Sequence, residues 1–397
     1  MKYDAVIVGG FGHVGLPLAI SLADTGQKIC ALDIDQRAQR TIGDGHMPFQ
    51  EDGAEELLRR TLANGNLTLS LDPNTIAQTE TVIVIIGTPV DRHLNPEFEL
   101  MRDIMASYLP YFLDGQLLVL RSTVYPGITE KLRTWLRSEG KQVELAFCPE
   151  RIAEGFAMTE LHSLPQIVSS FTEEGVSRAR TLFSRLTKEI IVLPPIEAEL
   201  AKLFTNVWRY IKFAAANQFF MLANDHGADF YRIHHAMTTN YERAKDLPRP
   251  GFAAGPCLFK DAMQLAAFNN GGFYMGHAAM LVNEGLPNYV VNMLKRQHDL
   301  REKTVGILGM AFKANIDDKR ESLSYKLKKI LLFEAKEVLC SDSNLRAEKG
   351  LVSSDELLRK SDIIIIGAPH REYKNLRVPE GKILVDVWNM GGKGWVI

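Results

Sequence analysis

A glycine-rich turn between two short apolar runs constrains this chain more than any other feature. Residues 3–8 (YDAVIV) are rich in β-branched side chains, Gly10, Gly12 and Gly15 follow as GxGxxG, and a helix-like segment leads to a second run that contains Asp33. Such glycines allow a tight turn and close approach of backbone N–H groups to a pyrophosphate at a helix N-terminus. A carboxylate at the end of the second strand accepts hydrogen bonds from ribose. The pattern predicts a dinucleotide-binding βαβ unit that prefers NAD, because Asp33 would repel the 2′-phosphate of NADP.

Strand-like and helix-compatible segments alternate on both sides of a long helical stretch. Apolar runs recur at 81–87, 116–123 and 143–150, and again from residue 304 in TVGILGMAF, EVLCSD, DIIIIGA and KILVDVW, with helices expected near 322–333 and 354–360. Alternation of this kind is typical of a parallel sheet covered on both faces. The predicted fold class is therefore α/β, with two Rossmann-like doubly wound parallel-sheet domains joined by a long central helix and a helical domain.

The change of pattern near Pro194 and Pro195 marks the first domain boundary. Residues 196–228 form one long helical pattern, interrupted only by Gly227, and further helical pattern continues to about residue 300 except for a loop at 246–261. A helix of this length often connects domains and supplies a dimer surface. We expect an NAD-binding domain at 1–195, a helical domain with a dimer interface at 196–300, and a second Rossmann-like domain at 301–397.

Composition and charge narrow the class of partner. The net charge of −2 provides no overall field that would attract nucleic acid or an anionic membrane. Residues 5–23 lack charged side chains, but their glycines break a continuous apolar helix, so we predict no signal peptide and no membrane segment. The four cysteines show no CxxC and the ten histidines no HExxH, which predicts a reducing, cytoplasmic location and no metal site.

The four cysteines differ in their surroundings. Cys30, Cys148 and Cys340 lie in apolar strand-like runs and are predicted to be small core residues. Cys257 lies instead in a loop of small residues, PRPGFAAGPCLFKD, just ahead of Lys260. A neighbouring cation could favour its thiolate. From the residues alone, Cys257 is either a nucleophile or a packed thiol.

Polar residues recur at helical spacing on the long helix. Lys202 and Asn206 are four residues apart, and the same stripe continues through Arg209, Phe213 and Asn217. One interpretation is a solvated stripe. The other is that an ammonium and an amide point into a cleft, where they could stabilise an oxygen as negative charge develops on it.

A third group of candidates follows two of the predicted strands. Glu150 and Glu154 lie in CPERIAEG, and Thr123 ends the run QLLVLRST. Acidic loop residues can simply be solvated. Their position at strand ends, where the sites of α/β proteins gather, makes them candidates for general acid or base work.

Taken together, these segments resemble the UDP-glucose/GDP-mannose dehydrogenase family over nearly the whole chain. The matching pieces, in the family's order, are VGGFGHVGLPLA, ALDID, IGTPVD, RSTVYPG, CPERIAEG, EAELAKLFTN, GFAAGPCLFKD, ILGMAFKANIDDKRES and LVDVWN. The Lys and Asn pair is also found in β-hydroxyacid dehydrogenases, but the cysteine loop with a second Rossmann-like domain is not.

The resemblance implies a four-electron oxidation of the C6 alcohol of a nucleotide sugar to a carboxylate, with two NAD⁺ consumed through a cysteine thiohemiacetal and a thioester. It implies that Cys257 is the nucleophile and that Lys202 and Asn206 stabilise the oxyanion. Asp261 and Thr123 would act with an ordered water, and Glu154 or Glu150 would serve as the base in hydrolysis.

The resemblance also assigns binding residues and an assembly. Those expected at NAD are Gly10, Gly12, Gly15, Asp33, Thr88, Thr123 and Arg320, the last reaching the cofactor from the C-terminal UDP-sugar-binding domain. Those expected at the nucleotide sugar are Lys260, Arg243, Phe312 and Lys313. The family implies a homodimer through the long helix and products that feed surface-polysaccharide synthesis.

Departures from the family pattern concern the sugar. FAAGPC replaces a glycine-richer ending of the cysteine loop, and Ser169 and Ser170 replace a common Gly-Gly. CLFKD and the AEG of CPERIAEG resemble UDP-glucose enzymes, while CPER and IGTPVD resemble enzymes of N-acetylhexosamine nucleotides. We expect UDP-glucose by a small margin, with UDP-N-acetylhexosamines and GDP-mannose as alternatives. A single-step dehydrogenase of hydroxyacid type and a catalytically silent NAD-binding protein are more distant ones.

Overall fold

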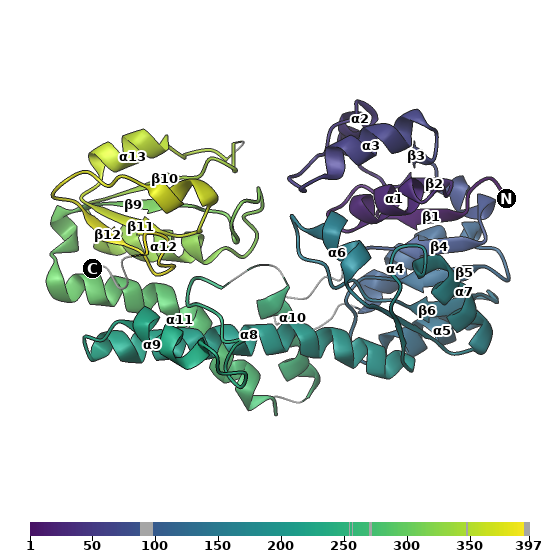
Figure 1. The fold of residues 1–397 in the computed structure, drawn as a ribbon. Coiled ribbons are helices and arrows are strands. Elements are labelled where there is room, and N and C mark those ends of the chain that lie inside the picture. The colour runs from purple at the N-terminus through teal and green to yellow at the C-terminus, as the bar shows by residue number, and fades with distance from the viewer. Residues whose placement is uncertain (88–97, 254, 256, 270–271, 347, 393–397) are drawn as a thin grey trace. The chain divides into compact units, whose positions relative to one another are not determined.

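Both predicted Rossmann-like sheets are present in a computed structural model that describes residues 1–87, 98–253, 255, 257–269, 272–346 and 348–392 (Figure 1). The chain divides into two units, Met1–Phe204 and Thr205–Ile397, and the helix α8 (Pro195–Asp225) contributes residues to both. This confirms the predicted α/β fold with a long central helix. The three-domain division at 195 and 300 stays a prediction.

The first sheet contains eight strands in the order β3-β2-β1-β4-β5-β6-β7-β8. Its strands are β1 (Ala5–Val8), β2 (Ile29–Leu32), β3 (Leu67–Ser70), β4 (Thr81–Val84), β5 (Leu117–Leu120), β6 (Glu144–Phe147), β7 (Gln166–Ser170) and β8 (Ile190–Val192). The strands from β3 to β6 are parallel, whereas β7 runs antiparallel to β6, with Phe147 opposite Ser169. The direction of winding reverses beside β1, where ligands bind at the carboxyl edge of doubly wound sheets.

Helices cover both faces of this first sheet (Figure 1). They are α1 (Gly15–Asp24), α2 (Gln36–Gly43), α3 (Ala54–Ala63), α4 (Phe98–Tyr108), α5 (Ile128–Ser138), α6 (Ala157–Ser163) and α7 (Glu173–Phe183), with 3-10 turns η1 (Pro73–Gln78) and η2 (Leu109–Tyr111). Ala5 and Ile7 of β1 belong to one apolar cluster, while Val6 and Val8 belong to another on the opposite face. Alternate residues of one fully buried strand thus serve two cores, which explains its continuous apolar sequence.

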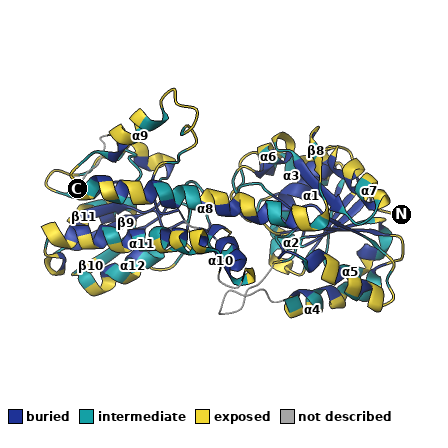
Figure 2. Cartoon of the chain, turned by 90° about the horizontal axis from the view of Figure 1, so that it is seen from below, coloured by how far each residue is buried: buried dark blue, intermediate teal, exposed yellow. Residues whose placement is uncertain are grey.

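The second sheet contains four parallel strands in the order β10-β9-β11-β12. They are β9 (Thr304–Leu308), β10 (Glu337–Ser341), β11 (Ile363–Ile366) and β12 (Ile383–Val385), and they alternate with α12 (Leu323–Glu334), α13 (Ser354–Lys360) and the turns η3 (Leu300–Glu302) and η4 (Arg371–Asn375). The interiors of both sheets are buried (Figure 2). The helices and strands predicted after residue 304 are confirmed.

The central helices differ from the prediction at both ends of the loop that was expected at 246–261, because the non-helical stretch already begins after Thr238. After α8 come α9 (Phe230–Thr238), α10 (Leu258–Phe268) and α11 (Tyr274–Gln297). Gly227 follows α8 in a left-handed conformation (φ +66°) and ends the helix, as predicted. The predicted loop 246–261 is too long at its end, because LFKDAMQLAAF already has the apolar spacing of a helix. In the described part of the chain, no helix combines the length and apolar character needed to cross a bilayer.

Candidate active site

The glycine-rich turn joins β1 to α1 at the carboxyl edge of the first sheet. A Cβ added to Gly10 would lie 2.8 Å from atoms of Ala31, and one added to Gly15 would lie 2.1 Å from the carbonyl oxygen of Gly9. One added to Gly12 would meet no protein atom closer than 3.7 Å. Packing within the protein therefore requires Gly10 and Gly15, whereas the space beside Gly12 is open to a ligand.

The surroundings of this turn fit NAD. Among the described residues, no side chain caps the N-terminus of α1 and no acidic residue lies in its first turn. The partial positive charge of that helix end is left for an anion such as a pyrophosphate. The half-buried Asp33 accepts the N–H of Phe11 at 3.0 Å, which places its carboxylate beside the turn, where a ribose would lie.

Two further residues were predicted at NAD. Thr88 lies outside the described residues. Arg320 belongs to the second unit, where its Nε donates to Asp318 at 2.7 Å while the side chain remains 54% exposed. Its role at NAD stays a prediction.

Cys257 is exposed, whereas Cys30, Cys148 and Cys340 are buried, and the burial of these three was predicted from the sequence. Burial raises the pKa of the Cys30 and Cys340 thiols to about 11 and that of Cys148 to about 12, so these three remain protonated near neutral pH. Cys257 occupies the residue before α10, at the positive end of the helix dipole. Of the cysteines, it has the accessibility and the local field that a nucleophile needs.

Asn206 and Asp261 form a buried pair beside the cysteine turn. The Asn206 amide donates to Asp261 Oδ2 at 2.6 Å, and the exposed fractions of the two residues are 5% and 0%. The N–H of Asp261 donates to the carbonyl of Cys257 at 2.9 Å, one helical turn away. The structure therefore brings three of the predicted catalytic residues together. Lys202, one turn before Asn206 on α8, is also buried.

The interpretation of a solvated polar stripe on α8 is wrong for Lys202, Asn206 and Asn217, which are buried. The predicted continuation through Arg209 is also wrong, because Arg209 is exposed and Tyr210 is buried in its place. The buried face of the helix passes from residue 206 to 210, a step of four, rather than the step of three that would include 209.

Asn217 fixes the loop that leads to Cys257. Its amide forms two hydrogen bonds with the backbone of Gly251, accepting the N–H at 2.8 Å and donating to the carbonyl at 3.1 Å. It also donates to Asn283 of α11 at 2.9 Å. The ring of Trp388 packs on Gly251, since an added Cβ would lie 2.2 Å from it. Gly251 is therefore held by Asn217 of α8 and by the ring of Trp388, which follows β12.

Of the residues predicted at the nucleotide sugar, Phe312 lies beside Gly255 of the cysteine loop. A Cβ added to Gly255 (φ +113°) would lie 2.6 Å from the ring of Phe312, so this ring packs directly on the cysteine loop. Lys260 and Lys313 are half-buried, and Arg243 is exposed.

Glu150, Glu154 and Thr123 lie beyond the carboxyl ends of the adjacent strands β5 and β6. Glu150 forms an ion pair with the fully buried Arg121, and its other oxygen accepts two backbone N–H groups at 2.7 and 2.9 Å. These bonds favour a structural role for its carboxylate. Glu154 and Thr123 are half-buried.

Comparison with known proteins decides the family. The NAD binding domain of the UDP-glucose/GDP-mannose dehydrogenase family matches residues 4–187, its central domain matches 196–284, and its UDP binding domain matches 306–392. The chain belongs to this family. It is therefore an NAD-dependent nucleotide-sugar dehydrogenase, and the predicted resemblance and cofactor are confirmed.

Different relatives of this dehydrogenase are named for different sugars. A UDP-N-acetyl-D-mannosamine dehydrogenase of Methanocaldococcus jannaschii is 28% identical, over 93% of this chain and 86% of the relative. The structure of a UDP-D-ManNAc dehydrogenase from Pyrococcus horikoshii has a TM-score of 0.88 and 26% identity, covering 96% of this chain and 94% of the other. A UDP-glucose dehydrogenase from Pyrobaculum islandicum also reaches 0.88 and 26%, covering 97% and 94%.

Sequence reasoning about the dehydrogenase missed the residues that hold its loops. The sequence does contain a signal for the structural role of Arg121, because it is the one charged residue in the apolar run QLLVLRST. Asn283 and Trp388 had none, because their partners lie far away along the chain.

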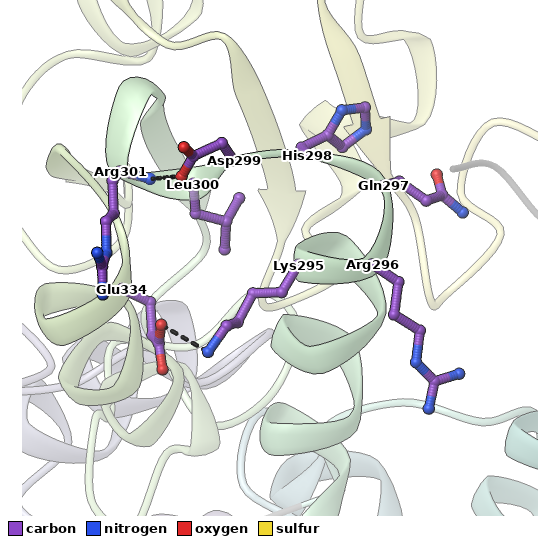
Figure 3. A pocket seen from close by; sticks show the side chains of 8 residues that line it. All are labelled: Lys295, Arg296, Gln297, His298, Asp299, Leu300, Arg301 and Glu334. Carbon is purple, nitrogen blue, oxygen red and sulfur yellow. Dashed lines mark hydrogen bonds and ion pairs between the residues drawn. The ribbon is translucent and has the colours of Figure 1, made fainter.

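A pocket outside these loops lies at the end of α11 (Figure 3). Lys295 in its wall is paired with Glu334 at 2.7 Å, and Arg296 points away from that pair. Basic residues in the last turn of a helix complement its dipole. This explains why Lys295 and Arg296 lie at the end of α11, and no bound ligand is needed to explain their charge.

Proposed function

We propose that this dehydrogenase oxidises the C6 alcohol of a UDP-N-acetylhexosamine, with UDP-N-acetylmannosamine as the first candidate, to the carboxylate. Support comes from the names of the M. jannaschii and P. horikoshii relatives. The segments CPER and IGTPVD point the same way. This proposal replaces our expectation of UDP-glucose, which the P. islandicum enzyme keeps as the alternative.

The observation that carries the proposed chemistry is the cysteine turn. An exposed thiol at a helix N-terminus lies one turn from a buried carboxylate that holds the Asn206 amide. A single-step alcohol dehydrogenase has no use for such a thiol. A covalent route does, because a thiolate adds to an aldehyde and the adduct keeps a hydride to donate.

In the proposed mechanism, the glycine-rich turn and Asp33 would hold NAD⁺, which would supply the hydride acceptor for each oxidation. Cys257 adds to the carbon of the intermediate aldehyde. Lys202 and Asn206 stabilise the negative charge that develops on the sugar oxygen. Asp261 fixes the amide of Asn206, so that its donor already points correctly when the charge appears.

Hydrolysis of the thioester completes the proposed cycle. Thr123 and Asp261 orient a water molecule, and Glu154 accepts its proton. We assign the base to Glu154 rather than Glu150, because Arg121 and two backbone N–H groups already engage Glu150.

We also propose that two copies associate through α8 in the cytoplasm. Phe204, Trp208 and Leu222 of this helix are each at least half exposed. Large apolar side chains gathered on one element commonly mark a protein interface.

The test is the number of NADH molecules released per sugar consumed, with UDP-N-acetylmannosamine, UDP-N-acetylglucosamine, UDP-glucose and GDP-mannose offered separately. We expect about two NADH with the preferred sugar, following the four-electron oxidation, and the highest kcat/KM with an N-acetylhexosamine. A ratio of about one would remove the covalent route. A higher kcat/KM for UDP-glucose would restore that sugar as the substrate.

A further inference from the structure

The segment that carries Glu154 is bound by carboxylates along its backbone. Glu150 accepts the N–H groups of the two residues that follow it, at 2.7 and 2.9 Å, and Glu160 accepts that of Ala153 at 2.6 Å. Both acceptors are near in sequence. Hydrogen bonds to ionised groups are stronger than neutral ones, so each of these contacts restrains the segment appreciably.

The third carboxylate comes from a distant part of the first unit. Glu51, in the loop between α2 and α3, accepts the N–H of Gly155 with Oε2 at 2.9 Å and that of Ala157 with Oε1 at 2.7 Å. These two N–H groups belong to the first and third residues after Glu154, and Ala157 begins α6. Gly155 has a φ of +81°, so the chain turns sharply between the two bonds. Glu51 therefore closes the turn that presents Glu154.

The position of Glu51 is energetically demanding. Burial raises the pKa of its carboxyl group, while the N–H groups of Gly155, Ala157 and Met158 lower it, and burial is the larger effect. An acid on the solvated surface would experience neither this burial nor these backbone N–H groups. The same loop places Phe49 against His13 of the glycine-rich turn, with the ring centroids 4.1 Å apart.

We propose that Glu51 is a positioning residue for thioester hydrolysis, acting by holding the turn at residues 154–157. This inference rests on the proposed function, in which water adds to the thioester carbonyl, Glu154 takes the proton, the C–S bond breaks and Cys257 leaves as a thiolate. Glu51 touches none of the reacting atoms. Its effect should therefore be confined to the step that uses Glu154.

The test compares Glu51→Ala, Glu51→Gln, Glu154→Gln and the control Asp52→Ala, which removes the exposed neighbouring carboxylate. Rapid-quench mass spectrometry of the intact enzyme follows the acyl group on Cys257, while absorbance follows NADH. In Glu51→Ala we expect decay of the acyl enzyme to slow about tenfold or more, because small misplacements of a catalytic group have such effects. In a single turnover, the rate of NADH formation and the Kd for NAD should change less than about twofold, since Phe49 still packs on His13.

The conservative variant refines this expectation. Glu51→Gln keeps one acceptor oxygen, so its rate of decay should lie between those of the wild type and Glu51→Ala. In the double variant Glu51→Ala/Glu154→Gln, decay should be no slower than in Glu154→Gln alone, because both changes act through one base. Equal slowing of NADH formation and decay, or additive effects in the double variant, would overturn the inference.

Hydrogen exchange supplies a readout that is independent of turnover. The amides of Gly155 and Ala157 should exchange faster in Glu51→Ala and Glu51→Gln but not in Asp52→Ala. Unchanged exchange in both Glu51 variants would overturn the inference. If the Glu51 variants decay normally while Glu154→Gln is slow, the positioning role fails and the proposed function stands. If Cys257→Ser still forms the acid, both fail.

Discussion

The two Rossmann-like units build the same first turn and use it differently. In the first unit, the N–H of Gly9 donates to the carbonyl of Leu32 at 2.9 Å, and in the second the N–H of Gly309 donates to that of Ser341 at 2.8 Å. In each unit an aspartate follows the second strand, Asp33 after β2 and Asp342 after β10. The frameworks correspond, so differences between the aspartates report on function.

In the second unit, the carboxylate that corresponds to Asp33 is already hydrogen-bonded within the protein. Asp342 is 7% exposed and binds the N–H groups of Met310 and Ala311 at 2.7 and 2.9 Å, as well as Nε2 of His370 at 3.1 Å. Asp33 accepts one long-range N–H and stays half-buried. A ribose can reach the carboxylate only in the first unit.

The helix N-termini show the same contrast. The side chain of Ser322 caps α12, accepting the N–H of Ser324 at 3.3 Å, whereas no described side chain caps α1. A filled cap leaves less room for a pyrophosphate. Of the two units, the first therefore presents the groups that suit a dinucleotide, an accessible carboxylate and a helix N-terminus that no described side chain caps.

Removing the carboxylate of Asp342 should have the largest effect on stability. Asp342→Ala leaves His370 and two buried N–H groups without their acceptor, which should lower the free energy of unfolding by about 3 kcal/mol. Asp33→Ala should lower it by less than about 1 kcal/mol. Urea unfolding of both variants measures this, and equal losses would contradict the contrast between the units.

The same pair should behave in the opposite way towards NAD. Asp33→Ala should raise the Kd for NAD about tenfold or more, because hydrogen bonds from ribose to a carboxylate are lost. Asp342→Asn should leave that Kd unchanged. Calorimetric titration with NAD measures both, and a weakened affinity in Asp342→Asn would show that Asp342 contributes to the NAD site.

The stability that Asp342 contributes should also depend on pH. Burial alone would raise the pKa of Asp342, but the hydrogen bond and charge of His370, with the N–H groups of Met310 and Ala311, hold it below its usual value. The stabilisation is therefore complete above the unfolded pKa of about 3.9 and is lost as the pH falls through the lower folded value. Wild type should lose more stability than Asp342→Asn as the pH falls below about 4, and parallel curves would argue against this origin.

The smallest expected effect concerns the helix caps. Ser322→Ala should destabilise the protein by about 1 kcal/mol, the usual cost of losing an N-cap. Val14→Ser, at the uncapped start of α1, should not weaken stability but should compete with a bound anion. Thermal unfolding with and without NAD compares them, and stronger NAD binding by Val14→Ser would contradict the proposed use of this helix end.

Much of the fold could be predicted from the sequence, because strands and glycine turns are local patterns, whereas the contrast between Asp33 and Asp342 could not. The helix 354–360 and most strands of both sheets were predicted from apolar runs, although β3 and β8 were not, and Cys257 stands out from three cysteines in apolar runs. The partners of side chains could not be predicted. Glu51 binds a turn 104 residues away, and Glu150 proved to be paired with Arg121. The prediction that Arg209 continues the polar stripe was wrong because the buried face of α8 passes from residue 206 to residue 210, a step of four, and residue 209 would need a step of three.

The most direct test of the central claim is to look for the covalent intermediate on Cys257. Wild-type enzyme mixed with NAD⁺ and UDP-N-acetylmannosamine, quenched in acid during turnover and digested, should yield the peptide containing Cys257 with the acyl sugar nucleotide attached. Cys257→Ser should show no such adduct and should form no acid. Acid formation by Cys257→Ser, or the release of two NADH per sugar without any adduct in the wild type, would contradict covalent catalysis by this residue.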